Sequence, residues 1–355
     1  MSDKSEDSSL SVAHGASDLP EVAVDSYNVE LREGAAFVGD RASKRAFNEI
    51  LEEGRERLRR IDEDPLGAVP TEELSKKKLE KELTSGDPEA AGLIQGAIEE
   101  FAGEMVAVIR RFLRLKPWRG VERLVIGGGF AGGRVGALAI GRAAVLLKAD
   151  GVELDLLPIR HHPDEAGLLG AVHLAPAWIF SGHEGILAVD IGGSNIRAGI
   201  VAFDVKKRPD HAKARVARSE LWRHAEEKPT RDEAIDRLIA MLESLIGRAT
   251  KEKLELAPFI GIGCPGVIRA DGTIESGGQN LPGNWESSRF NLPRLLREAI
   301  PEIGKAKTAV VMHNDAVVQG LSELPFMKDV KRWGVLTIGT GLGNACFTNK
   351  AEAKH

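Results

Sequence analysis

Apolar residues recur at helical spacing in the first third of the sequence. Through residues 89–115 they return every three or four positions, with charged and small residues between them. Because an α-helix turns once every 3.6 residues, this period predicts a long amphipathic helix. The same spacing predicts shorter helices over residues 41–60 and 74–83, the second of which ends before Pro88, a residue that cannot continue a helix.

From residue 120 onward, short apolar runs alternate with helical patterns. Runs of this length, bounded by glycine and polar residues, are typical of buried strands. We predict a strand, a glycine turn and a second strand over residues 185–203, and single strands over 124–126, 154–159, 259–263, 309–312 and 334–338. Helical patterns lie between them, up to residue 148 and over 165–175 and 231–251. The alternation predicts a layered α/β fold.

The size, charge and cysteine content of the chain exclude several classes of protein. At 355 residues and 38.3 kDa the chain exceeds one usual hydrophobic core, so we expect two lobes. A net charge of −5 gives no basic surface for nucleic acid, and no apolar run is long enough to span a membrane. Two cysteines supply neither a disulfide framework nor a Cys-rich zinc site. We expect a cytoplasmic protein without membrane or nucleic-acid partners, and a disordered tail over residues 1–26, which are rich in Ser, Asp and Glu.

The most distinctive local pattern joins an apolar strand to a polar glycine turn. The strand delivers Asp190, and the turn and its exit contain Gly192, Gly193, Ser194, Asn195 and Arg197. Backbone N–H groups at glycines approach phosphate oxygens closely, and hydroxyl and amide side chains add donors. A carboxylate at the strand end suits Mg²⁺ held through water. The alternative is a hairpin in which Asn and Gly only form the turn.

A second pattern of the same kind follows the strand at residues 334–338. Its glycine-rich turn holds Gly339, Thr340, Gly341 and Gly343, again either a phosphate-binding loop or a hairpin turn. Before it, the strand at 309–312 leads into Asn314 and Asp315. A carboxylate there is suited to take a proton from an attacking hydroxyl, although such a residue is also a common helix cap.

Two loops rich in Gly, Pro and Asn complete the candidate binding groups. They contain Gly266, Gly278 and Asn280, whose amide suits a polyol but also caps turns. A further motif, Gly127-Gly128-Gly129 through Gly132, fits the dinucleotide pattern G-x-G-x-x-G, with Asp150 near the expected acidic position. That pattern opens a different hypothesis, a NAD or flavin oxidoreductase.

Read together, these segments resemble the ROK family of bacterial sugar kinases and repressors, within the actin/hexokinase/Hsp70 ATPase fold. The resemblance covers residues 42–349 and implies a two-lobe, ribonuclease H-like α/β fold with a cleft between the lobes. It implies an ATP- and Mg²⁺-dependent kinase that phosphorylates a hydroxyl of a hexose or amino sugar, with Asp315 as general base. The implied roles follow the motifs: both glycine turns bind phosphate, Gly127, Gly128 and Gly129 face the adenosine, and the sugar is held by Gly266, Gly278, Asn280, Asn314 and Asp315.

The order of the motifs departs from the family. Its adenosine-side segment normally follows the second phosphate loop, whereas Gly127 precedes both glycine turns here. We therefore expect a circular permutation, with residues 27–180 and 333–355 forming the second lobe, residues 185–316 the first, and residues 317–332 connecting them. The family's zinc loop and its Glu-x-Gly-His sugar motif are missing from the pattern. A catalytically silent, sugar- or nucleotide-responsive regulator thus remains a second hypothesis, and whether the protein forms a homo-oligomer is left open.

Overall fold

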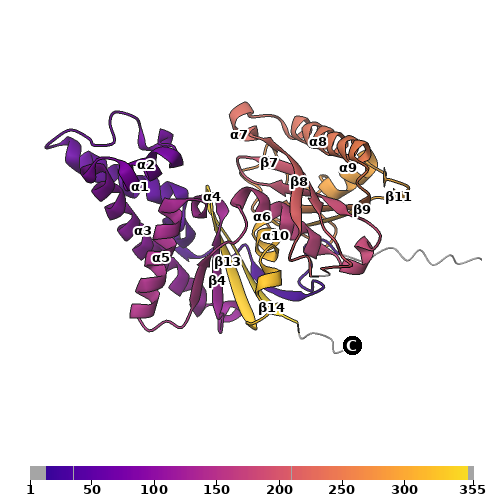
Figure 1. Cartoon of the computed structure of the whole chain (residues 1–355), viewed down its shortest axis with the longest axis horizontal. Coiled ribbons are helices and arrows are strands. Elements are labelled where there is room, and N and C mark those ends of the chain that lie inside the picture. Colours follow the sequence, from indigo (N-terminus) through magenta and orange to yellow (C-terminus); the bar gives the residue numbers. More distant parts are fainter. Residues whose placement is uncertain (1–12, 35, 209, 351–355) are drawn as a thin grey trace, which may run out of the picture. The chain divides into compact units, whose positions relative to one another are not determined.

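A computed structural model describes residues 13–34, 36–208 and 210–350. The chain folds into two compact units, labelled by element in Figure 1. Among the described residues, unit 1 consists of residues 13–20 and 171–314, and unit 2 of residues 21–170 and 315–350. Each unit is built around its own five-stranded sheet. The prediction of a layered α/β fold is confirmed at this level.

The sheet of unit 1 begins with the predicted strand–turn–strand segment. Its strands are ordered β12-β9-β6-β7-β8. The first three in the chain run antiparallel, whereas β9 and β12 run parallel to β6. Their bounds are β6 Gly185–Ile191, β7 Ile196–Ala202, β8 Arg215–Trp222, β9 Leu256–Cys264 and β12 Ala309–Asn314. Every residue of β6 is buried, as expected for a central strand covered on both faces.

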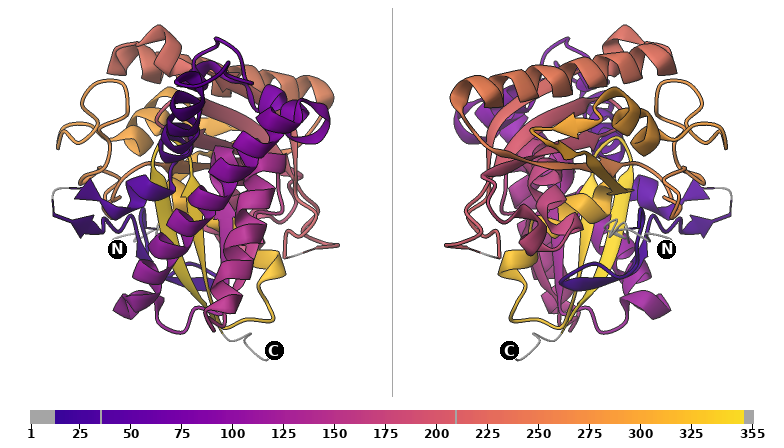
Figure 2. Two further views of the ribbon diagram at one scale, coloured as in Figure 1. Left: turned by 90° about the vertical axis from the view of Figure 1, so that its left-hand side faces the viewer. Right: turned by 90° about the vertical axis from the view of Figure 1, so that its right-hand side faces the viewer.

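Helices of unit 1 cover this sheet. The long helix α8, Arg231–Glu252, lies across β7 and β8 (Figures 1 and 2). It starts at a capping box in which Thr230 and Glu233 satisfy each other's backbone N–H groups. The remaining elements of this unit are η4 Ala171–Leu174, η5 Ala177–Phe180, α7 His224–Glu227, α9 Leu292–Ala299, β10 Glu302–Ile303 and β11 Ala306–Lys307.

The sheet of unit 2 has the same arrangement built from chain segments in a different order. Its strands are ordered β1-β14-β13-β4-β5. β13 and β14 form an antiparallel hairpin, β1 is antiparallel to β14, and β4 and β5 are parallel to β13. The bounds are β1 Val22–Tyr27, β4 Arg123–Gly127, β5 Asp155–Pro158, β13 Arg332–Ile338 and β14 Leu342–Asn349.

The helices of unit 2 form one continuous core with its sheet. The predicted long helix is α3, Pro88–Arg114, which contacts α1, α2 and α5 through buried apolar residues such as Phe101 and Ile98. The other elements are β2 Arg32–Glu33, β3 Ala36–Phe37, η1 Val38–Ala42, α1 Lys44–Arg59, η2 Thr71–Glu73, α2 Lys76–Ser85, η3 Lys116–Trp118, α4 Gly128–Ala131, α5 Arg134–Ala149, α6 Pro163–Gly170, α10 Asp315–Leu321 and η6 Leu324–Phe326.

The two sheets thus share one topology. Three antiparallel strands are followed by two parallel strands on the other side of the first, and a glycine turn joins the first two strands in each unit. This arrangement is typical of the ribonuclease H-like fold. In unit 1 the strands appear in chain order, whereas in unit 2 the third strand of the pattern, β1, comes first in the chain.

Several expected boundaries need correction. Residues 13–26 are not a disordered tail, because residues 13–20 belong to unit 1 and β1 pairs along β14; residues 1–12 lie outside the described residues. Residues 171–180 belong to unit 1 rather than to the second lobe. Residues 317–332 are not a connection, because α10 packs on β13 and β14 within unit 2. Asp315 and Ala316 likewise fall in unit 2, so the chain passes from unit 1 to unit 2 at the Asn314–Asp315 peptide bond.

Over the described ranges, we find no helix that has both the length and the apolar character needed to cross a membrane.

Candidate functional site

The first glycine turn joins β6 to β7 in unit 1. Its backbone closes through the Gly192 N–H, which donates to the Asn195 carbonyl at 2.8 Å. Asp190 and Arg197 are paired in register on the two strands, and Arg197 Nη1 lies 3.5 Å from Asp190 Oδ2. The turn therefore carries a carboxylate and a guanidinium side by side at the point where the strands end.

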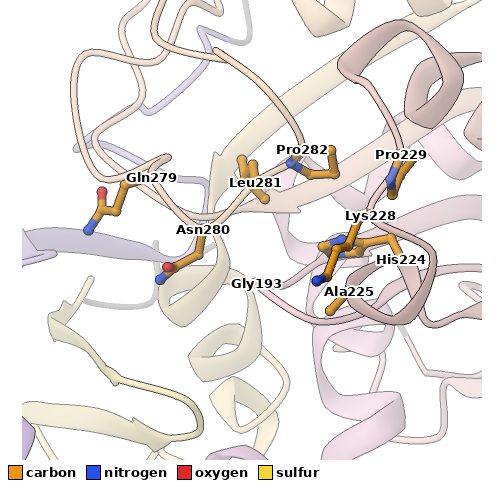
Figure 3. A pocket seen from close by; sticks show the side chains of 9 residues that line it. All are labelled: Gly193, His224, Ala225, Lys228, Pro229, Gln279, Asn280, Leu281 and Pro282. Atoms are coloured by element: carbon orange, nitrogen blue, oxygen red, sulfur yellow. The ribbon is translucent and has the colours of Figure 1, made fainter.

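A small cavity of about 250 Å³ opens beside this turn. Figure 3 shows Gln279 and Asn280 on one side of Gly193, and His224, Ala225 and Lys228 on the other. His224 Nε2 contacts the Gly192 carbonyl at 2.9 Å, and Asn280 packs against Gly193. The structure thus brings together two predicted groups, a phosphate-binding turn and the amide of Asn280.

The other predicted sugar-side residues of unit 1 belong to the same loop system. Asn314 Nδ2 donates to the Gly266 carbonyl at 3.0 Å, and the Gly278 N–H donates to Glu286 Oε1 at 2.9 Å. Asn314 is only 1% exposed. Its amide nitrogen is therefore engaged in holding the Gly266 turn, a structural role that the sequence pattern did not indicate.

A segment missed by the sequence analysis lies next to Asn314. His14 Nδ1 accepts a hydrogen bond from the Met312 N–H at 3.1 Å, and the Gly15 N–H donates to the Met312 carbonyl at 2.9 Å. Composition alone assigned these residues to a tail. Their contacts use the backbone of β12, so no apolar period in the sequence signals them.

The second glycine turn joins β13 to β14 in unit 2. The Gly339 N–H donates to the Gly341 carbonyl at 2.9 Å, and the Gly339 carbonyl accepts from the Lys44 N–H at the start of α1 at 3.1 Å. Thr340 and Gly341 are exposed. The tip of the turn is therefore accessible from solvent, which a phosphate-binding loop requires.

Asp315 begins α10, and packing within unit 2 fixes this helix beside the second glycine turn. Ala316 and Thr337 both lie against Gly343, so Asp315 directly precedes a residue in contact with β14. Asp315 Oδ1 accepts a hydrogen bond from the Ala316 N–H at 2.9 Å, and the residue is half-buried. The structure thus places the candidate base and the second glycine turn in one unit.

The predicted adenosine-side glycines lie against the same elements. Gln319 on α10 accepts a hydrogen bond from the Gly128 N–H at 2.8 Å, and Gly128 lies against the backbone of Ile338 at the end of β13. Gly127 also contacts Gln319. On the solvent side, Lys76 Nζ donates to the carbonyls of Gly129 and, at 3.1 Å, Gly132. Asp315, the second glycine turn and the Gly127–Gly129 turn therefore lie on neighbouring elements of unit 2.

The dinucleotide pattern lacks its acidic partner in the structure. Asp150 ends α5 and pairs with Arg110 at 2.6 Å. It precedes β5, whereas Gly127 ends the parallel strand β4, so the two residues lie at opposite ends of this strand pair. A ribose-binding acid must lie at the same strand ends as the glycines. This arrangement argues against the oxidoreductase hypothesis.

The side chains near the first glycine turn suit a magnesium ion that takes most of its ligands from a bound nucleotide and water. In the described part of the chain, no group of three or more His, Cys, Asp or Glu side chains is placed to hold a metal ion. Asp190 offers a single carboxylate, with Arg197 against one of its oxygens. Mg²⁺ at kinase sites commonly takes one or two carboxylates and completes its shell with water and substrate phosphates. Asp190 fits that limited role.

Burial of His313 makes the stability of the site region depend on pH. Its side chain is enclosed at the end of β12, and burial lowers its pKa to about 4. As the pH falls from about 6.5 toward 4, the unfolded chain takes up a proton that the folded chain excludes. We therefore expect the free energy of unfolding to fall by about 3 kcal/mol over this window.

Urea unfolding of the His313→Gln variant, compared with wild type at pH 7 and pH 4.5, measures this dependence. The variant should lose part of the stability at pH 7 and show a smaller change between the two pH values. His162, which is exposed, provides the matched control as His162→Gln. An unchanged pH dependence in His313→Gln would show that this imidazole does not titrate as described.

The chain is similar to several solved structures over part of its length. No protein-family model matches the chain, and no curated protein matches it. A ROK hexokinase from Thermus thermophilus is 24% identical, with 45% of each chain covered and a TM-score of 0.33. A ROK family glucokinase from Streptomyces griseus, solved with glucose and AMPPNP, is 21% identical, with 48% of this chain and 46% of that chain covered and a TM-score of 0.36.

A third structure is an inorganic polyphosphate/ATP-glucomannokinase from an Arthrobacter strain. It is 21% identical, with 48% of this chain and 62% of that chain covered and a TM-score of 0.33. The matches thus span less than two thirds of the length of each of these three structures. The solved structures to which this chain shows these partial likenesses are sugar kinases, two of them described as ROK proteins.

Proposed function

We propose that the protein is an ATP-dependent sugar kinase that transfers the γ-phosphate to a hydroxyl of a hexose or amino sugar. One observation carries the proposal: both units have the same sheet topology, and in both a glycine turn links the first two strands. A single glycine turn is a common hairpin feature. Two of them at equivalent positions of duplicated sheets, with a carboxylate beside the second, suit the handling of phosphate groups.

Unit 1 supplies the acceptor side in this proposal. Asn280 offers an amide beside Gly193, and Gly266 and Gly278 lie in the chain segment between β9 and Asn280. The Gly192–Asn195 turn provides backbone and side-chain donors for the phosphate group being transferred. Asn314 contributes by holding the Gly266 turn through its amide nitrogen.

Unit 2 supplies the nucleotide side and the base. Thr340 and the Gly339–Gly343 turn bind phosphate oxygens, and Gly127, Gly128 and Gly129 border the adenosine. Asp315 accepts the proton of the sugar hydroxyl as its oxygen bonds to the γ-phosphorus. The bond from that phosphorus to the β-phosphate oxygen breaks, and ADP leaves with the electron pair. Asp190 would hold a Mg²⁺ ion through water beside the nucleotide phosphates, and the bound ion would supply charge neutralisation.

We further propose that the chain is a circular permutation of a duplicated kinase fold. Two observations support this. The strand β1 occupies the third position of a sheet whose first two strands come last in the chain, and Val22 at the start of β1 pairs with Asn349 at the end of β14. A short hairpin link between these ends would restore the order found in unit 1. Adjacent surface ends are the condition under which permutation is tolerated.

Release of ADP from Mg-ATP across a panel of hexoses, amino sugars and acylated amino sugars tests the proposed activity. We expect one sugar class to stimulate ADP release at least tenfold above the rate without sugar. Binding of ATP is measured in parallel by calorimetry. Bound ATP with no stimulation by any sugar would contradict the kinase proposal and favour the regulator, which binding of DNA fragments at several salt concentrations would then test.

A further inference from the structure

Residues 13–20 attach to the open edge of the unit 1 sheet. β12 is an edge strand, so its outer N–H and C=O groups need other partners. Both groups of Met312 are taken by the segment: its N–H donates to His14 Nδ1 at 3.1 Å, and its carbonyl accepts from the Gly15 N–H at 2.9 Å. One residue further on, His313 Nε2 contacts the Ala16 carbonyl at 3.1 Å.

The His313 ring links the segment to Asn314. Because the Ala16 carbonyl can only accept, Nε2 carries the proton and Nδ1 is the acceptor. Nδ1 accepts from the Asn314 N–H at 2.7 Å. The imidazole therefore connects the segment to the backbone of the residue that holds the Gly266 turn.

The segment also fits closely against the neighbouring turn. Gly15 has φ +56°, and a Cβ built on it would lie 2.1 Å from the Ile268 carbonyl oxygen. Leu19, at the other end of the segment, is only 2% exposed. A side chain at position 15 is thus excluded by both conformation and contact, and the segment is anchored at both ends.

These contacts surround one functional group. Asn314 reaches from the end of β12 to the Gly266 carbonyl, and the segment contacts the residues on both sides of that bridge, Met312–His313 and Ile268. We propose that residues 13–20 are a positioning segment that sets the geometry of Asn314 and the Gly266 turn, and so the affinity for the sugar. This inference rests on the proposed kinase function. Because the segment is hydrogen-bonded to unit 1, its loss should weaken binding of the sugar and leave the nucleotide-binding groups of unit 2 unchanged.

The variant Gly15→Ala tests the segment, with Gly304→Ala as its matched control. Gly304 also lies in unit 1 with φ +66°, but a Cβ there meets nothing within 4 Å. The control therefore carries the same backbone strain without the collision. We expect Gly15→Ala to raise the KM for the sugar at least tenfold and to leave the KM for ATP within twofold, whereas Gly304→Ala changes neither.

Amide hydrogen exchange provides a readout that does not depend on catalysis. The Met312 N–H should exchange at least tenfold faster in Gly15→Ala than in Gly304→Ala, because its acceptor is the imidazole of His14. Leu19→Ala, which removes the buried anchor, should give the same changes if Gly15→Ala does not fold. Sugar KM values equal to the control in a folded variant would overturn the inference. A wild-type protein that phosphorylates no sugar would refute the proposed kinase function instead. In that case, unchanged exchange of the Met312 N–H in Gly15→Ala would refute the proposed role of residues 13–20.

Discussion

Replacing Asp315 with Asn is expected to lower kcat for phosphoryl transfer by roughly a hundredfold to ten-thousandfold. The amide keeps the size and the polar contacts of the carboxylate but cannot accept the proton of the attacking hydroxyl. Binding of ATP, measured by calorimetry, should change less than threefold, because the glycine turns remain. The loss should therefore appear in kcat rather than in KM for ATP.

The exposed Asp236 on α8 provides the control, as Asp236→Asn. This variant should keep wild-type kcat and thermal stability. Circular dichroism and the melting temperature show whether Asp315→Asn remains folded, which matters because Asp315 Oδ1 accepts the Ala316 N–H. A folded Asp315→Asn with more than a tenth of wild-type kcat would rule out this carboxylate as the base.

A methyl group at Gly170 is expected to destabilise unit 2 by about 2–3 kcal/mol, a fall in melting temperature of roughly 5–10 °C. Gly170 ends α6, which packs against α10. A Cβ built on it would lie 1.7 Å from the Val318 carbonyl oxygen and 3.1 Å from the Ser322 nitrogen. Both are backbone atoms, so Gly170→Ala can be accommodated only if one helix moves. Because α10 starts at Asp315, activity should fall together with stability.

Gly96→Ala is the matched control for this helix contact. Gly96 lies within α3, and a Cβ there meets nothing within 4 Å. Alanine at an open helical position should raise stability by about 0.5–1 kcal/mol. The two variants are thus expected to move the melting temperature in opposite directions. A Gly170→Ala protein as stable as Gly96→Ala would show that α6 and α10 do not pack as closely as described.

Long elements with a clear period were predictable from the sequence. The helix predicted over 89–115 is α3, and the strand–turn–strand over 185–203 is β6 and β7. β8 was not predicted, because its residues are mostly exposed or half-buried on both faces and show no alternation. β1 was not predicted, because it lies in a Ser-, Asp- and Glu-rich stretch and pairs with β14, which comes near the other end of the sequence.

The sequence was sufficient to predict which residues are candidates for the site. It was less informative about the contacts that these residues make. The glycine turns and Asp315 lie in motifs of recognisable spacing, which is why the sequence predicts them as candidate site residues. The inward hydrogen bond of Asn314 to Gly266 depends on loop geometry that no local pattern encodes. The same holds for Gln319, which reaches Gly128 across 191 positions of sequence. Sequence spacing reports local structure, whereas these contacts form only when distant segments meet.

The pairing of β1 with β14 also constrains the order in which the two sheets can form during synthesis. Val29 and Asn344, which are hydrogen-bonded just beyond this strand pair, lie 315 positions apart. At about 5–20 residues per second, the ribosome needs roughly 15–60 s to make the partner of a strand that has already emerged. During that time β1 has an unpaired edge, while every strand of the unit 1 sheet is completed first. The sheet of unit 2 therefore cannot be completed before residues 342–349 have been synthesised, however quickly its other strands pair.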